Sequence, residues 1–200
     1  RGIDSRWPAG LPSSGDAQLL FMQSAIEKMD DEHGRAAIIT NGSPLFNGGV
    51  SSGESQIRRW LLENDLIEAI IAMPTELFYN TGIATYVWIL SKNKRQERIG
   101  KIQLIDATEI YHTLRKSLGN KRKEFTAEDR KTITKLYSDF VENDKSKIYD
   151  NEEFIYKEYT VMQPLQRSYA INDERIENLE TSGKLNSFYD KIKHDEILEK

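Results

Sequence analysis

The stretch "LIEAIIAMPTELFYNTGIATYVWILS", residues 66–91, contains two apolar runs separated by about ten aromatic, polar and glycine residues. The runs, at 66–73 and 84–91, are short and rich in Ile, Val and aromatic side chains, a composition typical of β-strands. No helix separates them, so we expect the second strand to return antiparallel beside the first. Hairpin loops usually have about two to five residues, and longer loops in compact domains are often functional.

The segment before this hairpin is predicted to be a strand followed by a helix. "RAAIIT" at 35–40 is the strand, and Ser51 and Glu54 have the spacing of a capping box, which predicts a helix from there to about Asn64. Because a helix then joins the strands at 35–40 and 66–73, these two strands should run parallel. The helix is expected to turn three apolar side chains inward: Ile57, Trp60 and Leu61.

Two further elements extend this pattern. Apolar side chains at helical spacing predict a helix over roughly 16–31, and "GKIQLIDA" at 100–107 is predicted to be another strand. The apolar face of that helix would comprise Leu19, Met22, Ala25, Ile26 and Met29. Strands alternating with helices are typical of an open α/β sheet.

The character of the chain changes after residue 108, so we predict two parts, 1–108 and 109–200. The first residues of the second part are basic and fit neither a helix nor a strand clearly. From 172 onward the chain is charged and is expected to be helical.

Between these ends, the second part contains one well-marked helix. Thr126 and Asp129 have the spacing of a helix cap, and apolar residues follow at helical intervals. Residues 144–152 are predicted to be a polar break, and "EFIYKEYTVMQPL" at 153–165 a strand or one arm of a hairpin.

Composition limits the classes of protein that fit. The net charge is −4, there is no cysteine, and the three histidines have no metal-ligand spacing, so disulfides and cysteine-ligated zinc are excluded and no metal site is expected. No run approaches the ~20 apolar residues that span a bilayer, and the first ten residues lack the apolar core of a signal peptide. We therefore expect a cytoplasmic protein with no membrane partner.

Two basic runs stand out in this acidic chain: "KNKRQERIGK" at 92–101 and "RKSLGNKRK" at 115–123. Such runs are usually solvated loops, and the alternative is that they contact phosphates. The candidate phosphate contacts are Lys92, Lys94, Arg95, Lys121 and Arg122.

No Walker or Rossmann glycine motif, nucleophile elbow or His-Glu metal helix occurs in the sequence. Three segments do carry a resemblance when taken together: "NGSPLF" at 41–46, "SGES" with "IR" and "WL" over 52–61, and "LFYNTGIATY" at 77–86. They resemble the modification (M) subunit of type I restriction–modification systems. That family consists of S-adenosylmethionine-dependent DNA adenine-N6 methyltransferases. The resemblance covers roughly residues 6–110 closely and continues more loosely through "YTVMQPL".

The sequence also departs from the family. The family's cofactor-binding glycine motif and its catalytic Asn/Asp-Pro-Pro-aromatic motif are both missing, and in the family both lie before the matched residues. The resemblance therefore implies the C-terminal part of the subunit, with no catalytic residue in this span and the cofactor-binding residues unknown. The expected fold is the distal half of a Rossmann-like methyltransferase sheet, two parallel strands plus an antiparallel hairpin strand, with a mixed, mainly helical C-terminal extension. We expect these 200 residues to be inactive alone.

The resemblance also gives the long loop a role. In such enzymes an aromatic residue of this loop packs against the adenine that is extruded from the duplex. Phe78 matches that position best and Tyr79 second, and Asn80 would also contact the base. The alternative from residue types alone is that Phe78 and Tyr79 close the end of the core, with Gly82 supplying a turn.

The resemblance implies three partners: double-stranded DNA, the specificity (S) subunit and, in the full complex, the restriction (R) subunit. Residues 109–200 would contact other subunits. The alternative function is a non-catalytic assembly fragment that docks onto the specificity subunit.

Overall fold

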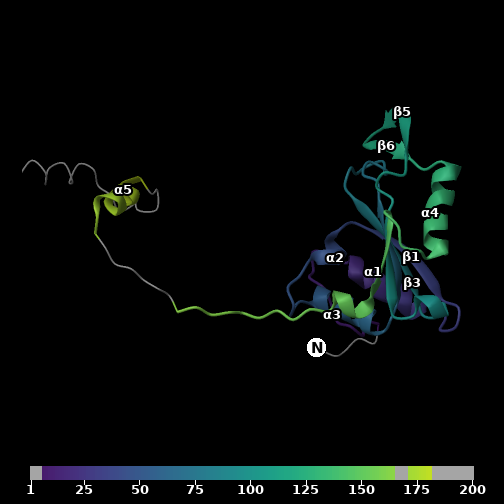
Figure 1. The fold of residues 1–200 in the computed structure, drawn as a ribbon, viewed down its shortest axis with the longest axis horizontal. Coiled ribbons are helices and arrows are strands. Elements are labelled where there is room, and N and C mark those ends of the chain that lie inside the picture. Colours follow the sequence, from purple (N-terminus) through teal and green to yellow (C-terminus); the bar gives the residue numbers. More distant parts are fainter. Residues whose placement is uncertain (1–5, 165–170, 182–200) are drawn as a thin grey trace, which may run out of the picture. The chain divides into compact units, whose positions relative to one another are not determined.

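Five strands pair into a central sheet in the order β1-β3-β2-β4-β7, shown in Figure 1. They are β1 (Arg35–Thr40), β2 (Ile67–Met73), β3 (Thr85–Ser91), β4 (Lys101–Asp106) and β7 (Ser146–Asp150). The structure is a computed structural model that describes residues 6–164 and 171–181.

The directions of the strands confirm the expectation from the hairpin. β3 pairs antiparallel with β2 on one side and with β1 on the other, so β1 and β2 run in the same direction. β4 lies parallel to β2, and β7 pairs antiparallel with β4. Three strands, β1, β2 and β4, therefore end at the same edge of the sheet.

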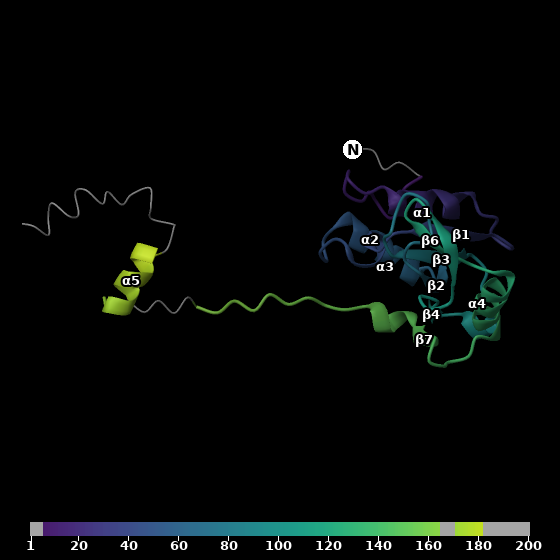
Figure 2. The same cartoon turned by 90° about the horizontal axis from the view of Figure 1, so that it is seen from above.

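Helices cover both faces of this sheet, as Figures 1 and 2 show. Helices α1 (Gln18–Lys28) and α3 (Gly53–Glu63) lie on one face, and α2 (Ser43–Phe46) precedes α3. Helix α4 (Ala127–Asp139) lies on the other. Side chains of a strand point alternately to the two faces, so β2, β3 and β4 supply both cores, whereas β1 packs against the first core and exposes its other face. The first core contains Leu19, Met22, Ile57, Leu61 and Trp88, and the second Ile71, Ile105, Ile133 and Leu136.

The helix starts are only partly as predicted. Thr126 and Asp129 form the expected capping box of α4. The cap of α3 is one residue later than predicted, because the Ser52 hydroxyl, not that of Ser51, accepts from the Ser55 N–H. Glu54 accepts instead from the Ser13 N–H at 2.7 Å, which ties the N-terminal segment to this helix.

The region after residue 108 holds more β-structure than the sequence predicted. β5 (His112–Leu118) and β6 (Lys121–Glu124) form a separate two-stranded hairpin, where we expected no clear element. The predicted polar break contains β7, so that prediction was wrong. The predicted strand at 153–165 was also wrong, since a short 3₁₀-helix (Asn151–Phe154) is followed by extended chain without pairing over 155–164.

The chain divides into two compact units, residues 1–158 and 159–200. β7 belongs to the sheet of the first unit, which is why this unit runs past the functional boundary predicted at residue 108. That boundary concerns roles and stays a prediction. Helix α5 (Asp173–Thr181) agrees with the helical expectation from 172, and the rest of that prediction, 182–200, lies outside the described residues. Within the described ranges, no helix is long and apolar enough to cross a bilayer.

Candidate nucleic-acid interface

The carboxyl ends of β1, β2 and β4 meet at one edge of the sheet, the edge at which open α/β sheets commonly bind ligands. β1 ends at Thr40 and leads into "NGSPLF", β2 ends at Met73 and leads into the loop 74–84, and β4 ends at Asp106 shortly before the β5–β6 hairpin. Figure 1 shows β5 and β6 beyond this end of the sheet. All three loops of interest therefore lie at this one edge.

The loop 74–84, here called the aromatic loop, is anchored at its base and exposed at its tip. Leu77 is buried, with 8% of its surface exposed, and Phe78 is half-buried and forms an isolated β-bridge with Thr81. Tyr79 is 60% exposed, and Asn80 beside it is exposed too. The Tyr79 ring is thus accessible for stacking against a ligand, since an exposed aromatic ring offers an apolar face together with a polar hydroxyl.

The basic β5–β6 hairpin stands directly against the aromatic loop. The Asn120 N–H donates to the Tyr79 carbonyl at 3.0 Å, and the Lys121 ammonium lies 5.2 Å from the centre of the Tyr79 ring. Arg122 makes an ion pair of 3.5 Å with Glu76. Two segments that the sequence singled out separately, the aromatic loop and the second basic run, therefore form one surface.

The first basic run is placed quite differently, and its lysines are engaged within the fold. The Lys94 side chain is 1% exposed and its ammonium makes a 2.5 Å ion pair with Asp65, so it cannot reach a phosphate. Burial lowers the pKa of Lys94, and the bond to Asp65 partly offsets this effect. Lys92 is bound to Asp31 at 2.6 Å and to the Met29 carbonyl at 2.8 Å.

These positions correct the phosphate-contact prediction for Lys94 and weaken it for Lys92. Arg95 is exposed on the far side of the strands from the aromatic loop, next to His33 and Glu32 in a small polar hollow. Of the five predicted contacts, the structure brings only Lys121 and Arg122 to the aromatic loop.

A buried arginine under α4 is a structural residue that sequence reasoning missed. Arg98 has 1% of its surface exposed, and its guanidinium lies 4.4 Å from the Tyr137 ring centre and 4.2 Å from that of Phe140. It pairs with the buried Glu68 at 3.4 Å. Burial, with a hydrogen bond to Glu68, raises the pKa of Tyr137 to about 12. This cluster fastens α4 to the sheet.

The loop after β1 is held by a reciprocal pair of side chains. Gln18 donates through Nε2 to Asn41 Oδ1 at 2.9 Å and accepts from the Asn41 N–H at 3.0 Å. Asn41 Oδ1 also accepts from the Ser43 N–H at 2.9 Å, which starts α2. "NGSPLF" is thus a fixed turn at the carboxyl edge, positioned by α1.

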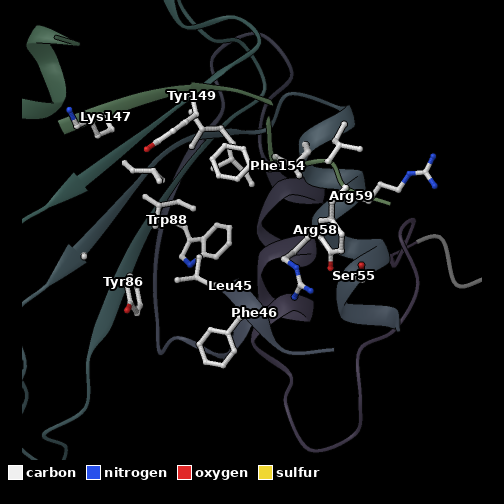
Figure 3. Close-up of a pocket in the computed structure, with 18 of the residues that line it drawn as sticks. Leu45, Phe46, Ser55, Arg58, Arg59, Tyr86, Trp88, Lys147, Tyr149 and Phe154 are labelled. Atoms are coloured by element: carbon white, nitrogen blue, oxygen red, sulfur yellow. The ribbon is translucent and has the colours of Figure 1, made fainter. Parts of the chain in front are cut away.

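A hollow of about 960 Å³ lies elsewhere, between the sheet and α3 (Figure 3). Trp88 and Leu45 line it, and Tyr149 and Phe154 meet edge to face at 5.7 Å at one end. None of the base or phosphate contacts predicted from the sequence lines this groove. We place the candidate site at the carboxyl edge, because the exposed Tyr79, the half-buried Phe78 and the unburied cations of the hairpin lie together there.

The described residues contain no cluster of three or more His, Asp or Glu side chains that could hold a metal ion, and the sequence has no cysteine. The sequence also has no glycine-rich motif with which these residues could cradle a nucleotide cofactor. The side chains present at this edge support recognition: stacking by aromatic rings and attraction of phosphates by cations.

The β5–β6 hairpin itself could have been found from the sequence. Gly119 and Asn120 form the two-residue connection between its strands, and Gly-Asn is one of the dipeptides typical of tight hairpins. The surrounding basic residues hid this pattern, because they lack the apolar alternation by which strands are recognised.

Comparison with protein families finds a match over residues 2–175 to the family described as N-6 DNA Methylase. Among curated proteins, the chain is 34% identical over 192 residues to the type I restriction enzyme MjaVIII methylase subunit of Methanocaldococcus jannaschii, covering 96% of this chain and 31% of that protein. It is 32% identical over 126 residues to the HindI methylase subunit of Haemophilus influenzae, covering 63% of this chain and 26% of that protein. The chain thus spans about a third or less of the length of these relatives.

A solved structure gives the same result. The methyltransferase subunit of a type I restriction-modification system from Streptococcus thermophilus superposes with a TM-score of 0.65 at 27% identity. The match covers 75% of this chain and 30% of that one. The mixed α/β fold is therefore shared with type I methyltransferase subunits.

Proposed function

The chain belongs to the N-6 DNA methylase family, and from this premise we propose that it is part of a type I modification subunit that methylates adenine N6 in double-stranded DNA. In this proposal the sheet is the distal part of a Rossmann-like methyltransferase domain. β1 and β2 then correspond to two parallel strands of that domain, with the antiparallel β3 between them, and β4 adds a further parallel strand beside β2.

The observation that carries the proposal is the convergence of the exposed Tyr79, its neighbour Phe78 and the hairpin cations at the carboxyl edge. A base cannot be methylated inside the duplex, so the enzyme must extrude it and replace its lost stacking partners. Tyr79 and Asn80 are exposed on the loop at this edge and Phe78 beside them is half-buried, and we assign all three to the extruded adenine. Lys121 and Arg122 on the neighbouring hairpin are assigned to phosphates beside that base.

The methyl donor of such an enzyme is S-adenosylmethionine. The residues of this chain do not fit it, because the glycine motif and the Pro-Pro motif are missing from the sequence. We therefore assign no residue of this chain to the donor and infer that the 200 residues alone neither bind it nor methylate DNA. Isothermal titration of the isolated chain with S-adenosylmethionine checks this, since stoichiometric heat would contradict it.

In the intact system we further propose that residues 109–200 contact the specificity subunit, and that the restriction subunit joins the same complex. This follows from the type I relatives and not from a contact in the structure. A modification enzyme acts on the chromosome of its host, so we infer a cytoplasmic location.

Single alanine substitutions in the complete methylase test the function. Tyr79→Ala and Phe78→Ala should each lower kcat/KM by roughly five- to a hundred-fold, because a base–aromatic stack is worth about 1–3 kcal/mol. Tritium transfer from labelled S-adenosylmethionine to unmethylated genomic DNA gives the rate, and thermal melting gives the stability. Phe21→Ala is the control, since Phe21 is a 68% exposed aromatic on α1 that is assigned to neither the base nor a phosphate.

The alternative for these residues is that they close the core. It predicts a large fall in melting temperature with normal activity per folded molecule, since truncating a buried Phe costs roughly 3–5 kcal/mol. Because Tyr79 is 60% exposed, Tyr79→Ala should have a melting temperature close to that of the control. Because Phe78 is half-buried, Phe78→Ala should lose some stability as well as activity. Full activity of both variants would remove the aromatic loop from the reaction.

A further inference from the structure

The turn of the β5–β6 hairpin is bonded to the backbone of the aromatic loop at two points. The Tyr79 carbonyl accepts from the Asn120 N–H at 3.0 Å. The Glu76 carbonyl accepts from two hairpin amides, those of Arg122 at 2.9 Å and Lys123 at 3.2 Å. The loop positions that flank Phe78 are thus fixed by the hairpin and not by the central sheet.

Glu76 adopts a backbone conformation that needs support from outside the loop. Its φ of 59° lies in the left-handed region, which side chains other than Gly, Asn and Asp rarely adopt. The hairpin supplies that support, because its two amides hold the Glu76 carbonyl and Arg122 pairs with the Glu76 carboxylate at 3.5 Å. Without these bonds the loop would be free to relax to an unstrained course.

Gly119 forms the closest approach between the two segments. Its φ is 64°, and a Cβ atom at this position would lie 2.8 Å from the Tyr79 carbonyl oxygen, closer than real Cβ atoms come to backbone. Any side chain here would push the hairpin turn away from the loop. The next residue but one, Lys121, places its ammonium 5.2 Å from the centre of the Tyr79 ring, so the ring is oriented as well as the backbone.

The hairpin has little else to hold it in place. A two-stranded hairpin alone is marginally stable in water, and most residues of β5 are exposed. Five cations and one carboxylate occupy residues 111–124, in a chain whose net charge is −4. A strongly cationic, exposed ribbon bonded to a base-contacting loop will respond to a nearby polyanion through its position as well as its charge.

We propose that the β5–β6 hairpin is a positioning arm for the aromatic loop: bound to duplex DNA through its cations, it sets the backbone of Glu76 and Tyr79 so that the aromatic rings meet the extruded base. This rests on the function proposed above and deepens it. Gly119 and Lys121 are positioning residues in this scheme, since they act through Tyr79. The arm links phosphate binding to base contact within one surface.

Two glycine substitutions in the complete methylase separate positioning from mere folding. Gly119→Ala and its control Gly100→Ala both place a side chain at positive φ, 64° and 71°, but a Cβ at Gly100 meets nothing within 4 Å. The backbone penalty is therefore matched, and only Gly119→Ala displaces the Tyr79 carbonyl. We expect kcat of Gly119→Ala to fall roughly ten- to a hundred-fold below that of the control, with KM for DNA within about twofold, because its cations remain.

A second measurement tests the contact between the hairpin and the aromatic loop without relying on enzyme activity. Hydrogen–deuterium exchange of the amides of Asn120, Arg122 and Lys123, and of the aromatic loop, should be faster in Gly119→Ala than in Gly100→Ala. Unchanged exchange overturns the proposal. So does faster exchange with an unchanged kcat when Tyr79→Ala itself is impaired, since the loop would then work without the arm.

The double variant locates the effect. If the arm acts through Tyr79, then Gly119→Ala with Tyr79→Ala should be no slower than Tyr79→Ala alone, whereas independent roles would multiply the two losses. Multiplied losses overturn the positioning role and leave the base contact intact. If Tyr79→Ala and Phe78→Ala are both fully active, the proposed function of the aromatic loop is wrong. Faster exchange in Gly119→Ala would then show only that the hairpin stabilises the loop.

Discussion

The segments 92–101 and 115–123 carry five cations each, yet they end in opposite environments. In the first, Lys94 and Arg98 are buried and paired with Asp65 and Glu68. In the second, Arg115 and Lys116 are exposed, and Lys121 lies over the ring of Tyr79. The number of cations is the same in both, so it does not decide the role.

The position of carboxylates decides it. Each cation of the first segment that is paired meets an acidic residue from a distant part of the chain: Asp31, Asp65, Glu68 or Asp150. The second segment meets mainly aromatic rings and backbone, apart from the Arg122–Glu76 pair. A cation that is neutralised inside the fold contributes to stability, whereas one left at the surface contributes to the field that attracts a polyanion.

The strongest test of this difference is the removal of one cation from each segment. Arg98→Ala should destabilise the chain by about 3–5 kcal/mol, because it leaves Glu68 buried with less compensation and opens space under Tyr137 and Phe140. Arg115→Ala, on the exposed hairpin, should change stability by no more than about 0.5 kcal/mol. Urea unfolding gives both values. Similar losses of stability in the two variants would contradict the proposed difference between the two segments.

The fold of the first half could be predicted from the sequence, because its strands are apolar and its helices amphipathic. β1, β2, β3 and β4 were all found, since their sequences are rich in apolar residues, and β2, β3 and β4 have apolar side chains in the cores on both faces. β7 was missed because it is an edge strand, where "SKIYD" can be polar and still pair with β4. The unpaired chain over 155–164 was mistaken for a strand because its side chains have high strand propensity with no strand to pair with.

The candidate site could be predicted in part. The aromatic loop was identified from its length and residues, because these are local properties. Lys94 is paired with Asp65, 29 residues away, and Lys121 lies beside Tyr79, 42 residues away. No local sequence pattern contains information about such distant partners. The same limit hid the contact between the hairpin and the loop, which joins residues on either side of β3 and β4.

Glu54 is a buried charge that is compensated by backbone hydrogen bonds and not by a cation, so it adds a third case to the two basic segments. Glu54 is 8% exposed, and hydrogen bonds, first from the Ser13 N–H, lower its pKa from 4.5 to about 2. Because the folded-state pKa is lowered, this stabilisation is present above pH 4.5 and is lost as the pH falls toward 2. Glu54→Gln should cost about 1.5–3 kcal/mol at neutral pH, the range for hydrogen bonds to charged groups.

Urea unfolding at several pH values checks this. The wild-type chain should lose stability relative to Glu54→Gln as the pH falls from 4.5 toward 2, so that the two curves converge in acid. Parallel curves would show that Glu54 titrates alike in the folded and unfolded states, and its burial would then carry no electrostatic stabilisation.

The salt dependence of DNA affinity tests whether the second segment contacts phosphates. Replacing Lys121 and Arg122 together by Gln should reduce the slope of log affinity against log salt by about two, since each phosphate that is no longer neutralised lowers it by about 0.9. The same double change at Lys92 and Lys101, which are paired within the fold, should leave the slope nearly unchanged. Fluorescence anisotropy of a labelled duplex with the complete methylase, at several salt concentrations, gives the slopes. An equal reduction of slope in both double variants would show that the first segment also faces DNA.

The smallest expected effect shows whether burial or contact distance determines how much the ion pairs of the first segment contribute to stability. Lys101 and Asp150 approach to 2.8 Å, closer than the 3.4 Å between Arg98 and Glu68, but their side chains are 42% and 62% exposed. Exposed ion pairs contribute about 0–1 kcal/mol because water and salt screen them, whatever their length. Lys101→Ala should therefore cost much less than Arg98→Ala, and most of that cost should vanish in ~1 M salt, because ions have free access to the exposed charges. The loss in Arg98→Ala should persist in the same salt, since no ions enter the space between Glu68 and the rings of α4. If Lys101→Ala instead costs as much as Arg98→Ala, contact distance governs these pairs, and the exposed Arg122–Glu76 pair at 3.5 Å would then rank with Arg98–Glu68 as part of the framework of the fold.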